Sequence, residues 1–95
     1  MGYHIELNSL LVVPENTLDL SNLEIGKTYR LTKDQERLYP INIPIDVCDK
    51  DYRYKGKVVV RKLTLETDVT SLEFEVLKIY SPEEAAMYTA NFIKP

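Results

Sequence analysis

The longest strand-like stretch of the chain is KVVVRKLTLETDVTSLEFEVLKIY, residues 57–80. It is rich in valine, threonine and other residue types that favour strands. Residues 57–65 and 69–80 form two apolar runs, and Thr67-Asp68 between them favours a tight turn. Because this turn lacks an Asn-Gly or Asp-Gly pair, a longer loop stays open as an alternative. The stretch predicts a long antiparallel hairpin.

The character of facing residues predicts the register of this hairpin. With the tight turn, apolar residues face apolar residues and a basic residue faces an acidic one: Leu63 with Leu72, Val59 with Val76, and Lys62 with Glu73. A slip of one residue would move apolar side chains to the polar face, so we expect this register. It also places Arg61 on the apolar face beside Phe74, within reach of a cation–π contact.

Segments outside the hairpin are predicted to form further strands and a segment that covers one end of the sheet. Residues 3–13 are apolar and β-branched up to Pro14, which predicts a strand with a bulge near Asn8. Residues 27–31 alternate polar with apolar positions and indicate a short strand. Residues 15–25 space leucines among polar residues, and we expect them to lie across an open end of the sheet.

Residues 39–47 show the most regular alternation in the chain. Five apolar side chains recur at every second position and would share one face of an extended strand: Tyr39, Ile41, Ile43, Ile45 and Val47. Pro40 and Pro44 lack N–H donors, so continuous pairing on both sides is excluded. The segment is predicted to be an edge strand or a broken strand, and an exposed edge could recruit a second copy of the chain.

The motif Ser81-Pro82-Glu83-Glu84 is a capping box with proline at the first helical position. It predicts a helix over about residues 82–92, whose acidic first turn suits the helix dipole. One stripe of this helix would face the sheet: Ala85, Tyr88 and Phe92, with Ala86, Ala90 and Ile93 beside it.

These elements fit one domain spanning residues 1–95, because a chain of 95 residues is too short for a second core. The expected fold is mainly β. It is a small antiparallel β-barrel or bent sheet of five to six strands with one C-terminal helix.

Charge and cysteine content restrict the partners and the compartment. The formal charge of −3 opposes long-range attraction to nucleic acid or to an anionic membrane. A single cysteine, Cys48, cannot form an intramolecular disulfide, which favours a cytoplasmic location. The first residues show neither a signal peptide nor a membrane span, and Glu6 stands where a myristoylation motif requires serine or threonine.

Catalytic and metal-binding constellations are not evident, so we expect no enzyme activity, no cofactor and no metal. Three dispersed glycines cannot build a phosphate-binding loop. An enzyme would have to gather Asp46, Asp49 or Cys48 with His4 in one pocket, and the two carboxylates would raise the pKa of the thiol.

A basic and aromatic cluster occupies residues 50–62, which hold six of the 12 lysines and arginines. Cations and rings are the two requirements for binding single-stranded RNA. The candidate contact residues for RNA or for a protein partner are Arg37, Tyr52, Arg53, Tyr54, Lys55 and Lys57, with Arg30 as a further possibility. Alternatively, Asp49, Asp51, Glu73 and Glu75 neutralise a solvated hairpin end.

Three segments carry a family resemblance: ELNSLLV at residues 6–12, RLYPINIPI at 37–45, and GKVVVRKL at 56–63. Together they resemble a family of short uncharacterised bacterial proteins, a domain of unknown function, which implies no activity and no site residues. A longer insert near residues 15–25 and an added C-terminal helix would be departures from that family. The strand order and glycine placement also resemble PUA and ASCH-like small barrels, many of which bind RNA.

The leading hypothesis from the sequence is a non-catalytic binding or protein-interaction domain, with a PUA-like RNA-binding module as the alternative. The expected partner is a protein or, second, RNA, and not a membrane. The expected oligomeric state is a monomer or a weak homodimer.

Overall fold

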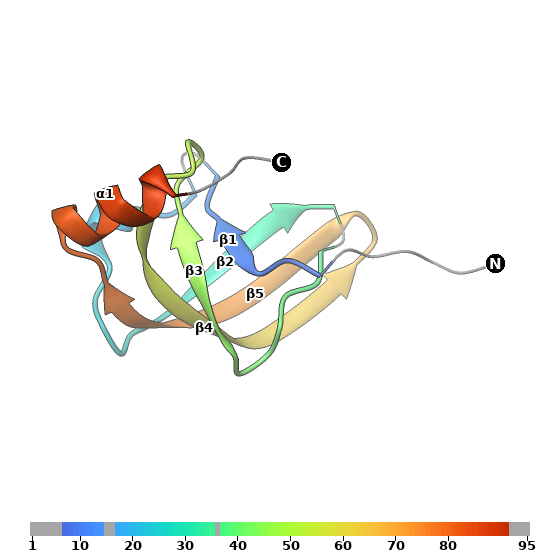
Figure 1. Ribbon diagram of the computed structural model, residues 1–95. Coiled ribbons are helices and arrows are strands. Elements are labelled where there is room, and N and C mark those ends of the chain that lie inside the picture. The colour runs from blue at the N-terminus through green and yellow to red at the C-terminus, as the bar shows by residue number, and fades with distance from the viewer. Residues whose placement is uncertain (1–6, 15–16, 36, 92–95) are drawn as a thin grey trace.

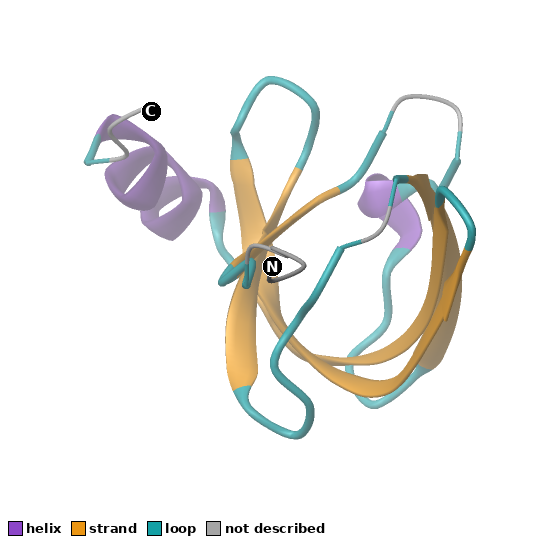
Figure 2. Ribbon diagram, turned by 90° about the vertical axis from the view of Figure 1, so that its right-hand side faces the viewer, coloured by secondary structure: helices purple, strands orange, loops and turns teal. Residues whose placement is uncertain are grey.

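The computed structural model describes residues 7–14, 17–35 and 37–91. Its elements follow in the order β1 (Leu10–Val12), η1 (Leu20–Asn22), β2 (Thr28–Asp34), β3 (Pro44–Cys48), β4 (Tyr54–Glu66), β5 (Val69–Ile79) and α1 (Pro82–Ala90). The strands form one five-stranded sheet in the order β1-β3-β4-β5-β2. The sheet curls into a half-barrel with α1 standing at one side (Figures 1 and 2). The expected mainly β fold with one C-terminal helix is confirmed.

The hairpin of β4 and β5 has the predicted register near its turn. Leu63 faces Leu72 and Lys62 faces Glu73, and Glu66 faces Val69 across a two-residue turn. Asp68 takes the left-handed conformation that closes this turn, with φ of 60°. An aspartate tolerates that conformation better than most residues, which explains a tight turn without glycine.

The predicted register fails over residues 58–61, because the ladder between β4 and β5 shifts at Arg61, and a second irregularity restores the register at Lys57, which faces Lys78. Val59 therefore faces Glu75 and not Val76. Such a bulge bends a strand and increases its twist, so it contributes to the curl of the sheet. It also turns Arg61 outward, where it pairs with Glu75 at 3.4 Å and not with the ring of Phe74. The expected cation–π contact was wrong for this reason.

Residues 39–47 do not form one continuous strand. Tyr39 and Ile45 are buried, whereas Ile41 and Ile43 are 41% and 57% exposed. Asn42 has φ of 61°, which interrupts the extended backbone and ends the alternation of faces. The strand is broken, as the prolines predicted, and β3 begins only at Pro44. β3 also lies inside the sheet between β1 and β4, so the expectation of an edge strand was wrong.

The strand predicted over residues 3–13 is shorter within the described residues, since β1 covers Leu10–Val12. Residues 3–6 lie outside the described part of the chain. β1 pairs with β3 in parallel, Leu11 facing Val47, whereas the other three strand pairs are antiparallel, so the sheet is mainly antiparallel as expected. The chain passes through β2 on the opposite edge of the sheet before it returns as β3, and this crossover permits a parallel pair.

The curl brings the two edge strands together. Lys33 on β2 donates a hydrogen bond from Nζ to the carbonyl oxygen of Val12 on β1, with 2.6 Å between the atoms. The core lies inside this curl and is built from residues of all five strands, with Phe74 and Leu72 fully buried. Leu18, Leu20 and Leu23 around η1 pack against it. The cover predicted from residues 15–25 is therefore confirmed for its described part, residues 17–25.

Helix α1 begins with the predicted capping box, in which Ser81 accepts from the backbone of Glu84 and Glu84 accepts from the backbone of Ser81. The expected docking stripe is only partly formed, because α1 contains no buried residue and Tyr88 is exposed on one side. Phe92 and Ile93, the remainder of that stripe, lie outside the described residues. No helix among the described residues is long and apolar enough to cross a membrane.

Candidate functional site

The structure separates the candidate contact residues into several places. Arg53, Tyr54 and Lys55 lie together at the start of β4, beside α1. Lys57 follows on β4, where it pairs with Asp46 of β3. Arg37 lies after β2, where its Nε donates to the carbonyl oxygen of Asp34. Tyr52 belongs to the turn between β3 and β4 and has φ of 62°. They do not form one continuous surface.

Most of the cations in the basic cluster stand next to carboxylates. The pairs join neighbouring strands or the turn before β4: Lys55 with Asp49 at 3.9 Å, Lys57 with Asp46 at 3.3 Å, Arg61 with Glu75 at 3.4 Å, and Lys62 with Glu73 at 3.9 Å. Partly exposed pairs of this kind contribute little to stability, but they cancel much of the local positive potential. This part of the surface is therefore better described as a solvated hairpin end with balanced charges than as a strip that binds phosphates.

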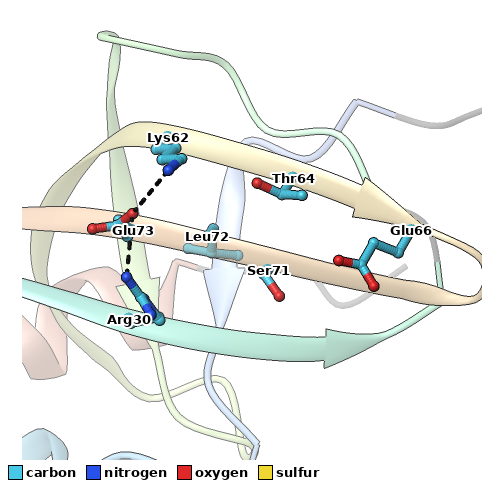
Figure 3. Close-up of a pocket in the computed structure, with 7 residues that line it drawn as sticks. All are labelled: Arg30, Lys62, Thr64, Glu66, Ser71, Leu72 and Glu73. Carbon is cyan, nitrogen blue, oxygen red and sulfur yellow. Dashed lines mark ion pairs between the residues drawn. The ribbon is translucent and has the colours of Figure 1, made fainter.

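A depression of about 240 Å³ lies on the outer face of β2, β5 and β4. Figure 3 shows Glu73 between Arg30 and Lys62, with dashed lines marking both ion pairs. Hydroxyl groups of Thr64 and Ser71 continue this surface (Figure 3). Because Arg30 and Lys62 both pair with Glu73 and the outward side chains are polar, the depression has the character of a solvated sheet face.

A larger groove, of about 410 Å³, separates α1 from the start of β4. Its lining combines small helical side chains with a ring and two cations: Ala85, Ala86, Thr89 and Ala90 from α1, and Arg53, Tyr54 and Lys55 from β4. The helix and the strand are held together at this place, because the backbone N–H of Tyr54 donates to Oγ1 of Thr89 at 3.1 Å. Figure 2 shows α1 beside the curled sheet, outside the curl.

Three tyrosines fix the position of α1. The ring of Tyr88 stacks on Tyr80 with 4.7 Å between centroids and on Tyr54 with 6.1 Å. The hydroxyl of Tyr80 donates to Oδ1 of Asp46 at 2.5 Å. Burial and this hydrogen bond raise the pKa of Tyr80, so its phenol stays neutral at physiological pH. These aromatic groups therefore position the helix.

Another cluster of titratable groups lies inside the curl and was missed by the sequence analysis. Lys33 is only 7% exposed. Its burial, with Arg37 nearby, lowers its pKa to about 8. Burial, with Asp49 as a further cause, raises the pKa of Cys48 to about 12, so the thiol stays protonated and unreactive. Tyr29, Leu31 and Lys33 alternate along β2, so extending the predicted strand by two residues would have placed Lys33 inside.

The groups of the hypothetical enzyme site are occupied in other ways. Oδ1 of Asp46 accepts from Tyr80 and from Lys57. Oδ1 of Asp49 accepts from the backbone N–H groups of Asp51 and Arg53 and thereby shapes the turn before β4. His4 lies outside the described residues. No group of three or more His, Cys, Asp or Glu side chains suited to a metal ion occurs within the described ranges.

Comparison with known proteins identifies the family. The model of DUF2584, a domain of unknown function, matches residues 1–83. The chain belongs to this family. The family resemblance inferred from the sequence is thus confirmed, and DUF2584 itself carries no assigned activity.

One relative of this DUF2584 protein is the uncharacterized protein YtmB of Bacillus subtilis. It is 29% identical over 82 residues, which cover 85% of this chain and 98% of YtmB. The X-ray crystal structure of YtmB matches with a TM-score of 0.67 and 29% identity, over 86% of this chain and 98% of YtmB. The fold is therefore shared with a solved structure.

The matched range ends at Glu83, within the first turn of α1. Helix α1 continues to Ala90, beyond the residues that the DUF2584 model matches. The expectation that the C-terminal helix is an addition to the family fold stays a prediction. The insert expected near residues 15–25 stays a prediction.

Proposed function

We propose that this DUF2584 protein is a non-catalytic interaction domain whose binding site is the groove between α1 and the start of β4. The observation that carries the proposal is the composition of this groove. Its walls are alanines and the ring of Tyr54, and its charged groups are Arg53 and Lys55. Protein-binding surfaces combine an apolar centre with aromatic and arginine side chains in this way.

The reactive groups of the described chain support a non-catalytic role. A cysteine nucleophile requires a lowered thiol pKa, and burial raises that of Cys48 to about 12. A general acid or base requires an accessible group that titrates near neutral pH. Lys33 titrates at about 8, but its amine is buried and donates to Val12.

Binding of single-stranded RNA is the alternative with less support. Arg53, Tyr54 and Lys55 bring two cations and a ring to one place, which suits a stacked base and its phosphates. The adjoining cations on β4 are neutralised by carboxylates, however, and the net charge of −3 repels nucleic acid. We therefore place a protein partner first.

A photo-crosslinking amino acid at Ala86 tests the proposal. Ala86 is exposed on α1 and lines the groove, so the larger side chain can be accommodated without disturbing the core. The same amino acid at Thr32 on the outer face of β2 serves as the control. The expected result, read by mass spectrometry after irradiation of living cells, is one or more proteins crosslinked through Ala86 and absent with Thr32.

Two other outcomes would contradict this function. RNA crosslinked through Ala86, with no protein, would put the RNA-binding alternative in its place. Turnover of a compound in a metabolite screen with the purified protein, together with no crosslinked protein, would show an enzyme and would overturn the non-catalytic role.

A further inference from the structure

The groove beside α1 has a net positive rim. Of its lining side chains, only Arg53 and Lys55 carry charge, and both are basic. Lys55 stands 3.9 Å from Asp49, at the outer limit of an ion pair. Arg53 forms no ion pair within the described residues, since it contacts Asp49 through its backbone N–H and carbonyl groups and not through its guanidinium. A partner can therefore place a carboxylate beside Arg53 without displacing an ion pair.

The interior of the groove suits an apolar side chain. Alanines at positions 85, 86 and 90 leave open volume where larger residues would fill it, and Tyr54 adds a flat aromatic wall. A volume of about 410 Å³ falls within the range of pockets that hold ligands. Burial of one large apolar side chain in such a site would therefore stabilise a complex.

Helix α1 supplies one entire wall of this groove, and it lies almost wholly beyond the family match at residues 1–83. The alignment with YtmB covers 98% of that protein but 85% of this chain, and because the family match ends at residue 83, we expect the unmatched part to include most of α1. The strand side of the groove lies within the family match, whereas almost all of the helix side lies beyond it.

Resting on the proposed function, we infer that α1 makes this chain a receptor for an acidic protein segment that carries one large apolar side chain. A DUF2584 protein of YtmB's length lacks the helix wall and does not bind this segment. Apolar burial provides the attraction, and Arg53 and Lys55 select acidic flanks. The overall charge of −3 disfavours long-range steering of an acidic partner, so selection depends on these two local cations.

The test measures fluorescence polarisation of short labelled peptides with the full chain. One peptide carries a single tryptophan flanked by aspartate and glutamate, a second replaces the acidic residues by lysine, and a third replaces the tryptophan by serine. We expect only the first to bind, with an affinity that falls as salt rises. YtmB is the natural control without the helix wall, and we expect it to bind none of the three.

Two variants locate the site. Ala86→Glu fills the groove and repels carboxylates, and Arg53→Glu reverses the unpaired rim charge. Each should weaken binding of the first peptide at least about tenfold, equal to ~1.4 kcal/mol. Lys27→Glu, a reversal of an exposed charge outside the groove, should leave the affinity unchanged.

Three results would overturn the inference: equal binding by YtmB, equal binding of the basic peptide, or binding that survives both groove variants. If proteins crosslink through Ala86 but the acidic peptide does not bind, the partner is not an acidic segment of this kind. The proposed interaction function would then still stand. No crosslinked protein at all would reject the proposed function itself.

Discussion

Lys33 shows how one residue links the two edges of the sheet. Its stem continues the core-facing side of β2 after Leu31, and its ammonium reaches a backbone carbonyl on β1. A buried lysine normally pairs with a carboxylate, whereas this one donates to the neutral oxygen of Val12. Its charged form is consequently disfavoured inside the fold, which lowers its pKa to about 8.

This arrangement predicts a pH dependence of stability. The pKa of Lys33 is about 8 in the folded state against an ordinary value of 10.5, so the unfolded state binds more protons between these values. The free energy of unfolding should therefore gain a rising contribution from about pH 8 to 10.5. In Lys33→Met this contribution should be absent. Urea unfolding of both proteins across this range measures the difference.

Cys48 acts in the opposite direction, because its raised pKa destabilises the fold once the thiol of the unfolded chain ionises. That contribution is present with and without Lys33, so it largely cancels in the comparison. Lys27→Met, at an exposed position, should keep the pH dependence of the unaltered protein. A parallel pH dependence in the Lys33→Met and unaltered proteins would show that the amine does not titrate as inferred.

At the scale of elements, the β4–β5 hairpin depends on one close approach between its strands. An alanine Cβ at Gly56 would lie 2.1 Å from the carbonyl oxygen of Lys78, which is part of the backbone and cannot rotate away. Gly56→Ala should therefore separate the strands and destabilise the protein by about 3 kcal/mol. Chemical denaturation monitored by circular dichroism measures this loss.

Gly26→Ala is the matched comparison. Gly26 has φ of 85°, but nothing lies within 4 Å of a Cβ at that position. Its cost should be limited to backbone strain, about 1–2 kcal/mol. If Gly56→Ala destabilised the protein less than Gly26→Ala does, the close approach of β4 and β5 would not be what constrains residue 56 to glycine.

The hairpin also shows what periodicity can and cannot predict. Near the turn, the pairs Leu63–Leu72 and Lys62–Glu73 were predicted because a tight turn sets the register locally. Farther along, the shift at Arg61 was not predicted. Three consecutive valines at residues 58–60 do not alternate, so they give no signal for the position of an extra residue.

At the scale of the whole molecule, α1 is an appendage to a sheet that holds its own core. The helix contributes no buried residue, and its position depends on Tyr88 between Tyr80 and Tyr54 and on the hydrogen bond from Tyr54 to Thr89. A chain ending at Ser81 should therefore keep its β-structure. It should lose about 1–2 kcal/mol of stability, mainly from the stacked rings.

Thermal unfolding with far-ultraviolet circular dichroism tests this independence. We expect a cooperative transition at a somewhat lower temperature, because the core cluster contains no residue of α1. Tyr88→Ala in the full chain should give a similar loss of stability. A truncated chain without a cooperative transition would show that α1 is part of the folding unit.

The candidate site was predicted in part. Arg53, Tyr54 and Lys55 were singled out because cations and rings recur there, and they do lie together in the groove. The alanines of the opposite wall gave no signal, because small side chains in a helix also suit ordinary packing. Arg37 was grouped with them by charge alone and lies beside Asp34 at the end of β2.

Local sequence patterns were sufficient to predict the hairpin turn, the capped helix and the high strand content, because each of these depends on residues close together in the chain. The parallel pairing of β1 with β3, the bulge at Arg61 and the contact of Lys33 with Val12 depend on residues brought together only by the curl of the sheet. The groove likewise joins residues 53–55 with residues 85–90. Sequence periodicity cannot predict these long-range contacts, because they follow from the packing of the whole chain around one core.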